Sequence, residues 1–293
     1  MKKLLVSFLM LCTATAFGQY QSEYSYVHPF MSDMALLKKN KVLEITTTSL
    51  DKDLEGGQSL KEIIHYVFDE EGRLMMEFRG ETFANGVLHQ GDYALKFEYA
   101  FASNLPYKIT VFTNEAGEVK SYEQMYEYNA QGQLVAFNSS QDNTEKKFSY
   151  KNGKLDGYVV TSQLDYLNDK VNYKYPNATT REEYGWGMDP NDTSDDPKEK
   201  FVHRLTEKLN AKGLVLEAIY NPTIGAQNIV QYTYVGNALT KVVSKLNDGS
   251  IADNCVNTFN AVGLQTQQKW TWFQMYSTDK TREMTTTFKY DYR

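Results

Sequence analysis

Cysteine and proline are scarce in this chain of 293 residues, which has two cysteines and six prolines. Cys12 lies in an N-terminal segment with the layout of an export signal, so Cys255 is left without a partner for an internal disulfide. The mature fold must therefore hold together without a covalent framework. The low proline content, together with 22 tyrosines and 15 phenylalanines, excludes a disordered chain and favours β-strands.

An excess of positive charge is also absent. The net charge of −6 excludes nucleic acid and anionic membranes as main partners. After the N-terminal segment no apolar run approaches the roughly 20 residues of a membrane-spanning helix, so no membrane span is expected in the mature chain. The four histidines are scattered without metal-ligand spacing. Nucleotide-binding, zinc-protease and nucleophile motifs do not occur, and the sequence predicts no catalytic or cofactor-binding residue.

The N-terminus has the three parts of a secretory signal. Two lysines precede an apolar segment from Leu4 to Cys12, and mostly small residues follow. We expect cleavage to remove residues 1–19. Lipid attachment at Cys12 is disfavoured, because Leu11 occupies the position where the lipidation motif requires a small residue. The sequence therefore predicts an exported protein, located in the periplasm, at the cell surface or outside the cell.

A turn signature recurs along the chain, in which Asp or Asn lies three residues before Gly between alternating apolar and polar segments. Its five copies are Asp69–Gly72, Asn114–Gly117, Asn129–Gly132, Asn210–Gly213 and Asn260–Gly263. Two-residue hairpin signals lie between them at 85–86, 152–153, 236–237 and 248–249. Asp or Asn can accept hydrogen bonds from the backbone ahead of it, and Gly can take the positive φ that closes a hairpin. We therefore expect positive φ and hairpin tips at the five glycines.

These signals predict an all-β fold, a long and curved antiparallel meander of stacked β-hairpin repeats with a dozen or more strands and little helix. One group of hairpins spans residues 20–171 and a second spans 201–293, and both are expected in the same sheet. Residues 172–200 interrupt the pattern with turn formers and acids, which predicts an exposed loop outside the sheet. A short helix is expected at 32–39, whereas 59–67 fits a helix or a strand.

Two of the turns resemble the tyrosine–aspartate (YD) repeat of Rhs proteins, in which an aromatic residue and Asp are followed, after two residues, by Gly, Arg and Leu. The better match is Phe68, Asp69, Gly72, Arg73 and Leu74, and the next is Tyr128, Asn129, Gly132 and Leu134. The other copies depart from the pattern. The resemblance implies a secreted bacterial protein built from degenerate hairpin repeats. Large Rhs proteins build a shell around a toxin, but this chain is far shorter and has no evident cargo domain, so that role is not implied.

The acidic part of the interruption is the candidate metal site. Its oxygen-bearing side chains are Asp189, Asn191, Asp192, Asp195 and Asp196. Calcium takes about six to eight hard oxygen ligands, which such a loop can supply. The order of residues lacks the central Gly and the late Glu of an EF-hand loop, so a solvated acidic loop is the alternative.

Tryptophan marks a second candidate, a surface for a protein or glycan partner. The period of two puts Trp270, Trp272 and Tyr276 on one face of a predicted strand. Trp186 lies between two glycines, which leave its ring open. Aromatic rings stack on sugars and anchor protein interfaces. For the pair on the strand, a core cluster is the alternative.

Three hypotheses about function remain from the sequence. The first is an exported, non-enzymatic binding or structural repeat protein whose ligand is unknown. The second is a hydrolase of extracellular polymers that uses paired carboxylates, although 37 acidic residues make the proximity of some pair uninformative. The third is an outer-membrane β-barrel, because residues 93–101 alternate as a lipid-facing strand does. Charges on both faces of most other segments, and Arg293 as the last residue, disfavour the barrel.

Overall fold

The structure is a computed structural model. It describes residues 34–53, 60–79, 82–84, 87–89, 93–101, 103–115, 117–163, 169–188, 199–220, 228–273 and 280–293. The expected signal peptide at 1–19 therefore lies outside the described residues, as do the five candidate calcium ligands. Among the helices of the described part, none has both the length and the apolar character needed to cross a bilayer.

The described chain is almost entirely β-strand, with one short helix, α2 (Met34–Lys39). The strands are β1 (Val42–Asp53), β2 (Leu60–Phe68), β3 (Leu74–Arg79), β4 (Thr82–Ala84), β5 (Val87–His89), β6 (Tyr93–Tyr99), β7 (Pro106–Glu115), β8 (Glu118–Tyr128), β9 (Leu134–Ser139), β10 (Thr144–Lys151), β11 (Lys154–Thr161), β12 (Asp169–Asn177), β13 (Thr180–Met188), β14 (Glu199–Leu209), β15 (Val215–Tyr220), β16 (Asn228–Val235), β17 (Ala238–Lys245), β18 (Ile251–Phe259), β19 (Gln265–Phe273) and β20 (Lys280–Tyr292). The predicted helix is confirmed, and the ambiguous segment at 59–67 is a strand.

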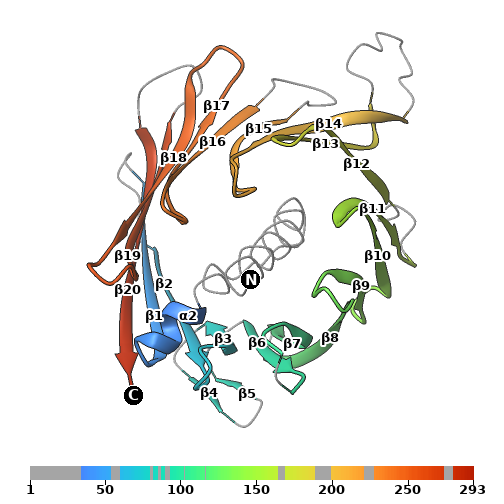
Figure 1. The fold of residues 1–293 in the computed structure, drawn as a ribbon. Helices are drawn as coiled ribbons and strands as arrows, with labels where there is room; N and C mark the ends of the chain where they lie inside the picture. The colour runs from blue at the N-terminus through green and yellow to red at the C-terminus, as the bar shows by residue number, and fades with distance from the viewer. Residues whose placement is uncertain are drawn as a thin grey trace.

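Eighteen of these strands form one sheet that closes into a barrel (Figure 1). Each strand pairs antiparallel with the next along the chain, except that β4 and β5 form a separate hairpin between β3 and β6. The last strand, β20, also pairs with β1 along nearly the whole of both strands. The all-β antiparallel meander is confirmed. Closure into a barrel was expected only from the third hypothesis, and it leaves none of these eighteen strands with an unpaired edge.

The predicted loop at 172–200 is wrong over most of its length. Residues 169–177 and 180–188 form the paired strands β12 and β13, and β14 begins at Glu199. Pro176 is tolerated because it lies at the end of β12, beside a register shift, where the sheet does not need its missing N–H. Of the acids of β13, Glu183 accepts a hydrogen bond from Tyr173 on β12, and Glu182 accepts one from Tyr184 on β13 itself. What remains of the predicted loop, residues 189–198, lies outside the described part.

A five-residue turn recurs at one end of the barrel. It begins at Asp69, Asn129, Asn210 and Asn260. In each turn the side-chain oxygen of the first residue accepts hydrogen bonds from the backbone N–H groups two and four residues later. All five predicted glycines have positive φ, as expected. Asn114 differs, because its side chain accepts only from Gly117 and its hairpin, β7–β8, closes at the opposite end.

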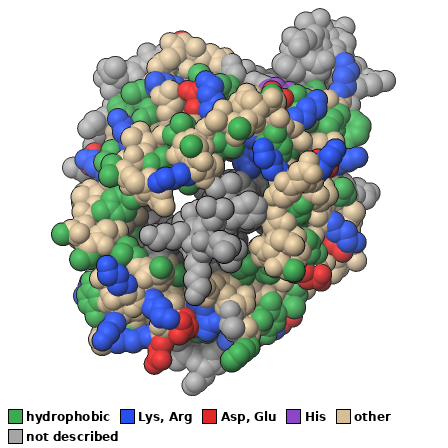
Figure 2. Space-filling model, viewed as in Figure 1, with side chains coloured by type: hydrophobic (Ala, Val, Ile, Leu, Met, Phe, Trp, Pro, Cys, Tyr) green, Lys and Arg blue, Asp and Glu red, His purple; other side chains and the backbone are tan. Residues whose placement is uncertain are grey.

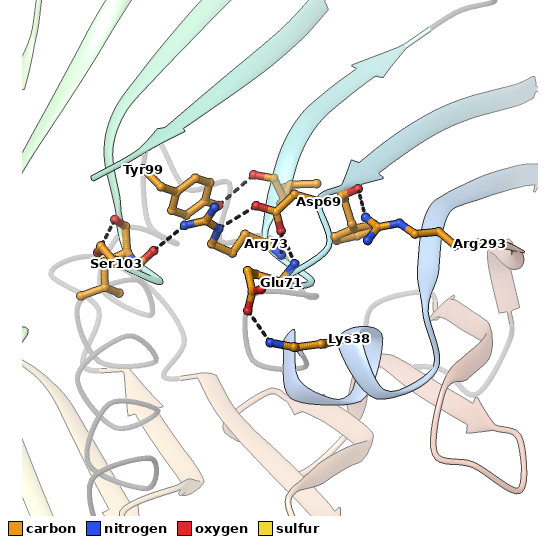
Figure 3. Close-up of polar contacts among 10 residues, drawn as sticks. Lys38, Asp69, Glu71, Arg73, Tyr99, Ser103 and Arg293 are labelled. Atoms are coloured by element: carbon orange, nitrogen blue, oxygen red, sulfur yellow. Dashed lines mark hydrogen bonds and ion pairs between the residues drawn. The ribbon is translucent and has the colours of Figure 1, made fainter. Parts of the chain in front are cut away.

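In two of the four turns, the side chain of the residue after the glycine links the turn to the next one. Arg73 Nε donates to Asp69 of its own turn at 2.7 Å, and its Nη1 donates to the carbonyl oxygen of Ser103 in the following turn at 3.0 Å (Figure 3). Gln133 does the same with an amide, bonding Asn129 at 2.9 Å and the carbonyl oxygen of Gly153 at 3.0 Å. Neighbouring turns are thus linked through one side chain.

Tyrosine hydroxyls provide a second link at the same end. The tyrosine near the end of a strand donates to the carbonyl of the first or second residue of the strand before it, over 2.6–3.1 Å. The pairs are Tyr99 with Leu74, Tyr128 with Pro106, Tyr150 with Leu134, Tyr175 with Leu155 and Tyr290 with Gln265. Each ring is largely packed against the core. A buried hydroxyl needs such a partner, so the aromatic position before the turn favours tyrosine.

Alternation along the strands divides the side chains into two faces. On β12, Val171 and Tyr173 are buried whereas Lys170 and Lys174 are exposed, and residues on the buried face form one continuous hydrophobic cluster from β1 to β12. Cross-strand partners place Cys255, Trp270 and Thr286 on the same face. Side chains that point into a cylinder converge and cover each other, whereas those outside diverge. The buried face is therefore the inner wall of the barrel, and the opposite face is its outer wall.

The outer wall carries charges (Figure 2). Its ion pairs are Lys96–Glu98, Lys108–Glu98, Lys108–Glu123, Lys147–Glu145, Lys208–Glu217 and Lys269–Glu283. The alternating segment at 93–101 does not face outward as a lipid-facing strand would. Its Leu95 and Phe97 lie in the inner wall, with 6% and 3% of their surface exposed, because the outward positions of β6 are taken by Lys96 and Glu98.

Helix α2 packs on the turn end beside the strands that close the barrel. Leu37 is buried in the core cluster, and Lys38 forms an ion pair with Glu71 of the first five-residue turn (Figure 3). The last residue, Arg293, donates its backbone N–H to Lys41 and its guanidinium to the carbonyl oxygen of Phe68. These contacts join both ends of the described chain at the closure.

Substitution of Gly72 tests the packing of α2 on the first five-residue turn. A Cβ there would lie 2.5 Å from the carbonyl oxygen of Met34, and φ is +75°. At Gly249, φ is +83° and a Cβ would meet nothing within 4 Å. Gly249→Ala should lower the free energy of unfolding by about 1 kcal/mol through left-handed strain alone. Gly72→Ala should cost about 2–3 kcal/mol because α2 must also shift. Urea denaturation measures both, and equal losses would contradict the packing of α2.

Candidate functional site

The inner wall is the candidate site, because its polar and aromatic side chains converge inside a closed ring. Two parts of it stand out. The aromatic sector, on β15–β20, is centred on Trp270 and Trp272. The ionic cluster, on β12–β14, consists of Asp169, Tyr173, Arg181, Glu183, Arg204 and Glu207.

Trp270 and Trp272 lie on the same face of β19, as the sequence predicts. Their rings stack with centroids 5.9 Å apart and planes 20° apart. The guanidinium of Arg282, on β20, lies 5.0 Å from the Trp272 ring centroid. Both indoles are half-buried rather than fully enclosed. The sector therefore presents large aromatic edges to the inside of the barrel.

Polar groups surround the two tryptophans. Asp253 lies opposite Trp272 on β18 and accepts a hydrogen bond from Ser244 at 2.9 Å. Asn257 Oδ1 accepts from the amides of Gln265 and Gln268, at 3.2 Å each. These amide and hydroxyl groups are satisfied within the wall.

Cys255 lies beside them with 1% of its surface exposed, and its thiol donates to Asn257 over 3.6 Å. Burial, reinforced by the charge of Asp253, raises the pKa of the Cys255 thiol to about 12. The thiol therefore stays protonated near neutral pH and is a packed residue rather than a nucleophile.

The ionic cluster lies on the inner wall where an apolar side chain would be expected. Arg181 pairs with Glu207, and its guanidinium lies 5.5 Å from the Tyr173 ring centroid. The hydroxyl of Tyr173 donates to Glu183 at 2.7 Å. Burial raises the pKa of Glu183, an effect that the Tyr173 hydrogen bond partly offsets.

A glycine makes room for the second arginine of the cluster. Arg204 lies at a register shift in β14 and donates to Asp169 at 2.9 Å and to the backbone carbonyl of Trp186. Its guanidinium occupies the space that a Cβ on Gly185 would take. Sequence reasoning missed this cluster because residues 172–200 were expected to leave the sheet. The available signal was the period of two in Arg181 and Glu183.

Trp186 does not join the other two tryptophans. It lies on the outer wall with 49% of its surface exposed, and its ring meets Phe201 edge to face at 6.1 Å. Tyr276, the fourth residue of the predicted partner surface, lies outside the described residues. The predicted surface is therefore divided between two faces of the barrel.

Histidines and acids form no metal centre in the described part of the chain, where no group of three His, Cys, Asp or Glu side chains could hold an ion. His65 bonds Glu44 at 2.7 Å and stacks on Phe78, with ring centroids 4.8 Å apart. His203 stacks on Tyr184 at 5.0 Å. Both rings lie in outer-wall contacts with a neighbouring strand.

Comparisons with known proteins show distant likenesses. No family model and no curated protein matches the chain. A porin-like protein from Bacteroides uniformis is 12% identical over 86% of this chain and 97% of that one, with a TM-score of 0.41. A putative outer membrane lipoprotein-sorting protein domain from Vibrio parahaemolyticus is 8% identical over 88% and 91%, with a TM-score of 0.27. The complex TcdB2–TccC3 without its hypervariable C-terminal region is 12% identical over 80% and 13%, with a TM-score of 0.29. At these values the likenesses carry no argument about function.

Glu77 tests whether the inner wall excludes water. Its carboxyl is fully buried, and burial raises its pKa from 4.5 to about 8, while Arg79 lowers it and Glu62 raises it further. The folded state then holds this proton more tightly than the unfolded chain does, so the free energy of unfolding should fall as pH rises from about 4.5 to about 8.

The variant Glu77→Gln keeps the shape of the side chain but cannot ionise. It should lose that pH dependence and be more stable than the parent by roughly 3 kcal/mol at about pH 9, and by much less at about pH 5. Urea denaturation at the two pH values measures the difference. Identical pH slopes in parent and variant would show that water reaches Glu77.

Proposed function

We propose that the protein is an exported, water-surrounded barrel that binds a largely apolar ligand on its inner wall and does no chemistry on it. The distribution of polarity carries this proposal: the outer wall carries ion pairs, whereas a continuous hydrophobic cluster covers the inner wall from β1 to β12 and tryptophans lie on its aromatic sector. In an outer-membrane barrel the distribution is reversed, with an apolar band outside and a polar interior.

The outer wall favours water over lipid as its surroundings. Lys108, on β7, pairs with both Glu98 and Glu123, and Lys269, at the middle of β19, pairs with Glu283. A lysine on the lipid face of a barrel costs about 2–4 kcal/mol at the bilayer midplane. Charges on neighbouring strands would multiply that cost, whereas in water they are stable.

The inner wall favours an apolar ligand with aromatic contacts. Tyrosine and tryptophan present large, rigid surfaces that lose little conformational entropy on binding. In the aromatic sector they are half-buried, and Tyr220 keeps 43% of its surface exposed although it lies on the inner wall. The mouths of β-barrels are common ligand sites.

A hydrolase is the second candidate, because carboxyl groups with raised pKa values are what a general acid needs. Two inner-wall carboxyls, Glu77 and Glu183, have this property. However, Glu77 has no exposed surface, and the hydrogen bond that Glu183 accepts from Tyr173 favours its ionised form. A general acid must reach its substrate and carry the proton that it donates, so the binding function is favoured.

The proposal also includes export of the protein and its relation to YD-repeat proteins. The N-terminal signal supports a location in the periplasm, at the cell surface or outside the cell. The YD-repeat resemblance is supported by the pairing of Asp69 with Arg73, which gives a structural reason for the Asp and Arg of that repeat. The ligand is proposed from the inner wall alone and not from any relative.

The test uses the purified mature protein, without detergent, and the neutral fluorescent probe N-phenyl-1-naphthylamine. The probe should bind saturably, and Trp272→Ala should weaken binding about fivefold to tenfold, since one aromatic contact is worth about 1 kcal/mol. Trp186→Ala is the matched control, because it removes an exposed tryptophan from the outer wall and should leave affinity unchanged.

Two results would overturn the proposal. The first is a folded parent protein that shows no saturable probe binding. The second is a protein that aggregates without detergent and inserts into lipid vesicles, which would restore the membrane barrel.

A further inference from the structure

The ionic cluster provides evidence about the charge of the ligand. Both of its guanidinium groups already have partners within the wall. Arg181 pairs with Glu207 and lies over the ring of Tyr173, and Arg204 bonds Asp169 and the carbonyl oxygen of Trp186. Arginine has a fixed fork of donors, so these contacts leave little capacity for an incoming anion.

The carboxylates of the cluster keep spare capacity. Three carboxyl groups face two guanidinium groups, so the cluster has a formal charge of −1. Glu183 accepts a hydrogen bond from the hydroxyl of Tyr173 at 2.7 Å and, among the described residues, forms no ion pair, although the charges of Arg204 and Arg181 lie near enough to lower its pKa. An ionised carboxylate offers about four acceptor sites, so most of those on Glu183 are not used.

An open aromatic surface lies beside these carboxylates. Along one row of the inner wall, Glu183 lies opposite Leu205, which lies opposite Tyr220 on β15. Strands are about 4.8 Å apart, so Glu183 and Tyr220 are roughly 10 Å apart. Burial raises the pKa of the Tyr220 hydroxyl, and the nearby charges of Glu207 and Glu183 raise it further. Aromatic faces next to carboxylates attract cations, quaternary ammonium groups in particular.

We propose that the ligand of the inner wall is a cationic amphiphile, whose ammonium group lies between Glu183 and Tyr220 and whose apolar chain runs along the aromatic sector. This inference rests on the proposed binding function and adds the charge of the ligand to it. The adjacent row of the inner wall runs from Glu207 across β15–β18 to Trp272, so one molecule can contact both parts of the wall.

Three decyl amphiphiles that differ in the head group provide the test, each used below its critical micelle concentration. They are decyltrimethylammonium, decyl sulfate and decyl glucoside, and each is titrated against bound N-phenyl-1-naphthylamine. The cation should bind about tenfold more tightly than the neutral glucoside, and the sulfate more weakly than either. Binding of the cation should strengthen as pH rises, because burial raises the pKa of Glu183 and only the ionised carboxylate attracts it.

Variants separate the head-group contact from binding of the chain. Glu183→Gln keeps an acceptor for the Tyr173 hydroxyl and should lower the affinity of the cation about tenfold, to that of the glucoside, whose own affinity should not change. Glu145→Gln, on the outer wall, is the matched control and should leave the affinities for both the cation and the glucoside unchanged. Tyr220→Leu should weaken binding of the cation more than binding of the glucoside. This variant serves as the test if Glu183→Gln does not fold.

The outcomes distinguish this inference from the proposed function. Equal binding of the cation and the glucoside, or tighter binding of the sulfate, would overturn the cationic ligand and leave the apolar-ligand barrel in place. Absence of binding by all three, with a folded protein, would overturn both.

Discussion

Pairing of β20 with β1 is the interaction on which the rest of this structure depends. Cys255, the cysteine in the described part of the chain, is free, and an open sheet of eighteen strands would have two long edges available for aggregation. Closure removes both edges and also creates an inside and an outside. The candidate site depends on that division, because the same alternating strands in an open sheet would expose both faces to water. Arg293, which bonds Lys41 and Phe68, holds the end of the last strand at the closure.

The repeat has a physical purpose beyond the turn itself. Each five-residue turn satisfies its own backbone through Asp or Asn, and a side chain such as Arg73 or Gln133 then reaches the next turn. Tyrosine hydroxyls add a bond to the strand before. Contacts between neighbouring repeats are therefore local in sequence, while closure joins residues separated by most of the chain. Stability built mainly from nearest-neighbour contacts is typical of repeat proteins.

The sequence predicts the turns, the helix and the strand class, because these depend on residues within a few positions of each other. The glycines at Gly72 and Gly132 illustrate this, since their positive φ follows from the turn type alone. Closure is not predictable in this way, because nothing local marks β1 and β20 as partners. The sequence also does not show which face of a strand points into the barrel. The alternation in 93–101 therefore suggested a lipid-facing strand, whereas Leu95 and Phe97 point inward. The ionic cluster was missed because its acids resemble those of a solvated loop until the neighbouring strands are in place.

The charged groups of the inner wall lower the stability of the fold. That cost is the main reason for assigning them a role in ligand binding. Taking Arg181 and Glu207 out of water costs more than well-packed apolar residues of similar size would. Glu77 and Glu183 are held with raised pKa values because burial disfavours their charged forms. Ion pairs on the outer wall carry no such penalty, since water solvates them. A barrel built for stability alone would keep its charges outside. The polar groups that remain within an aromatic wall are therefore best explained by a ligand that has both an apolar part and a charged one.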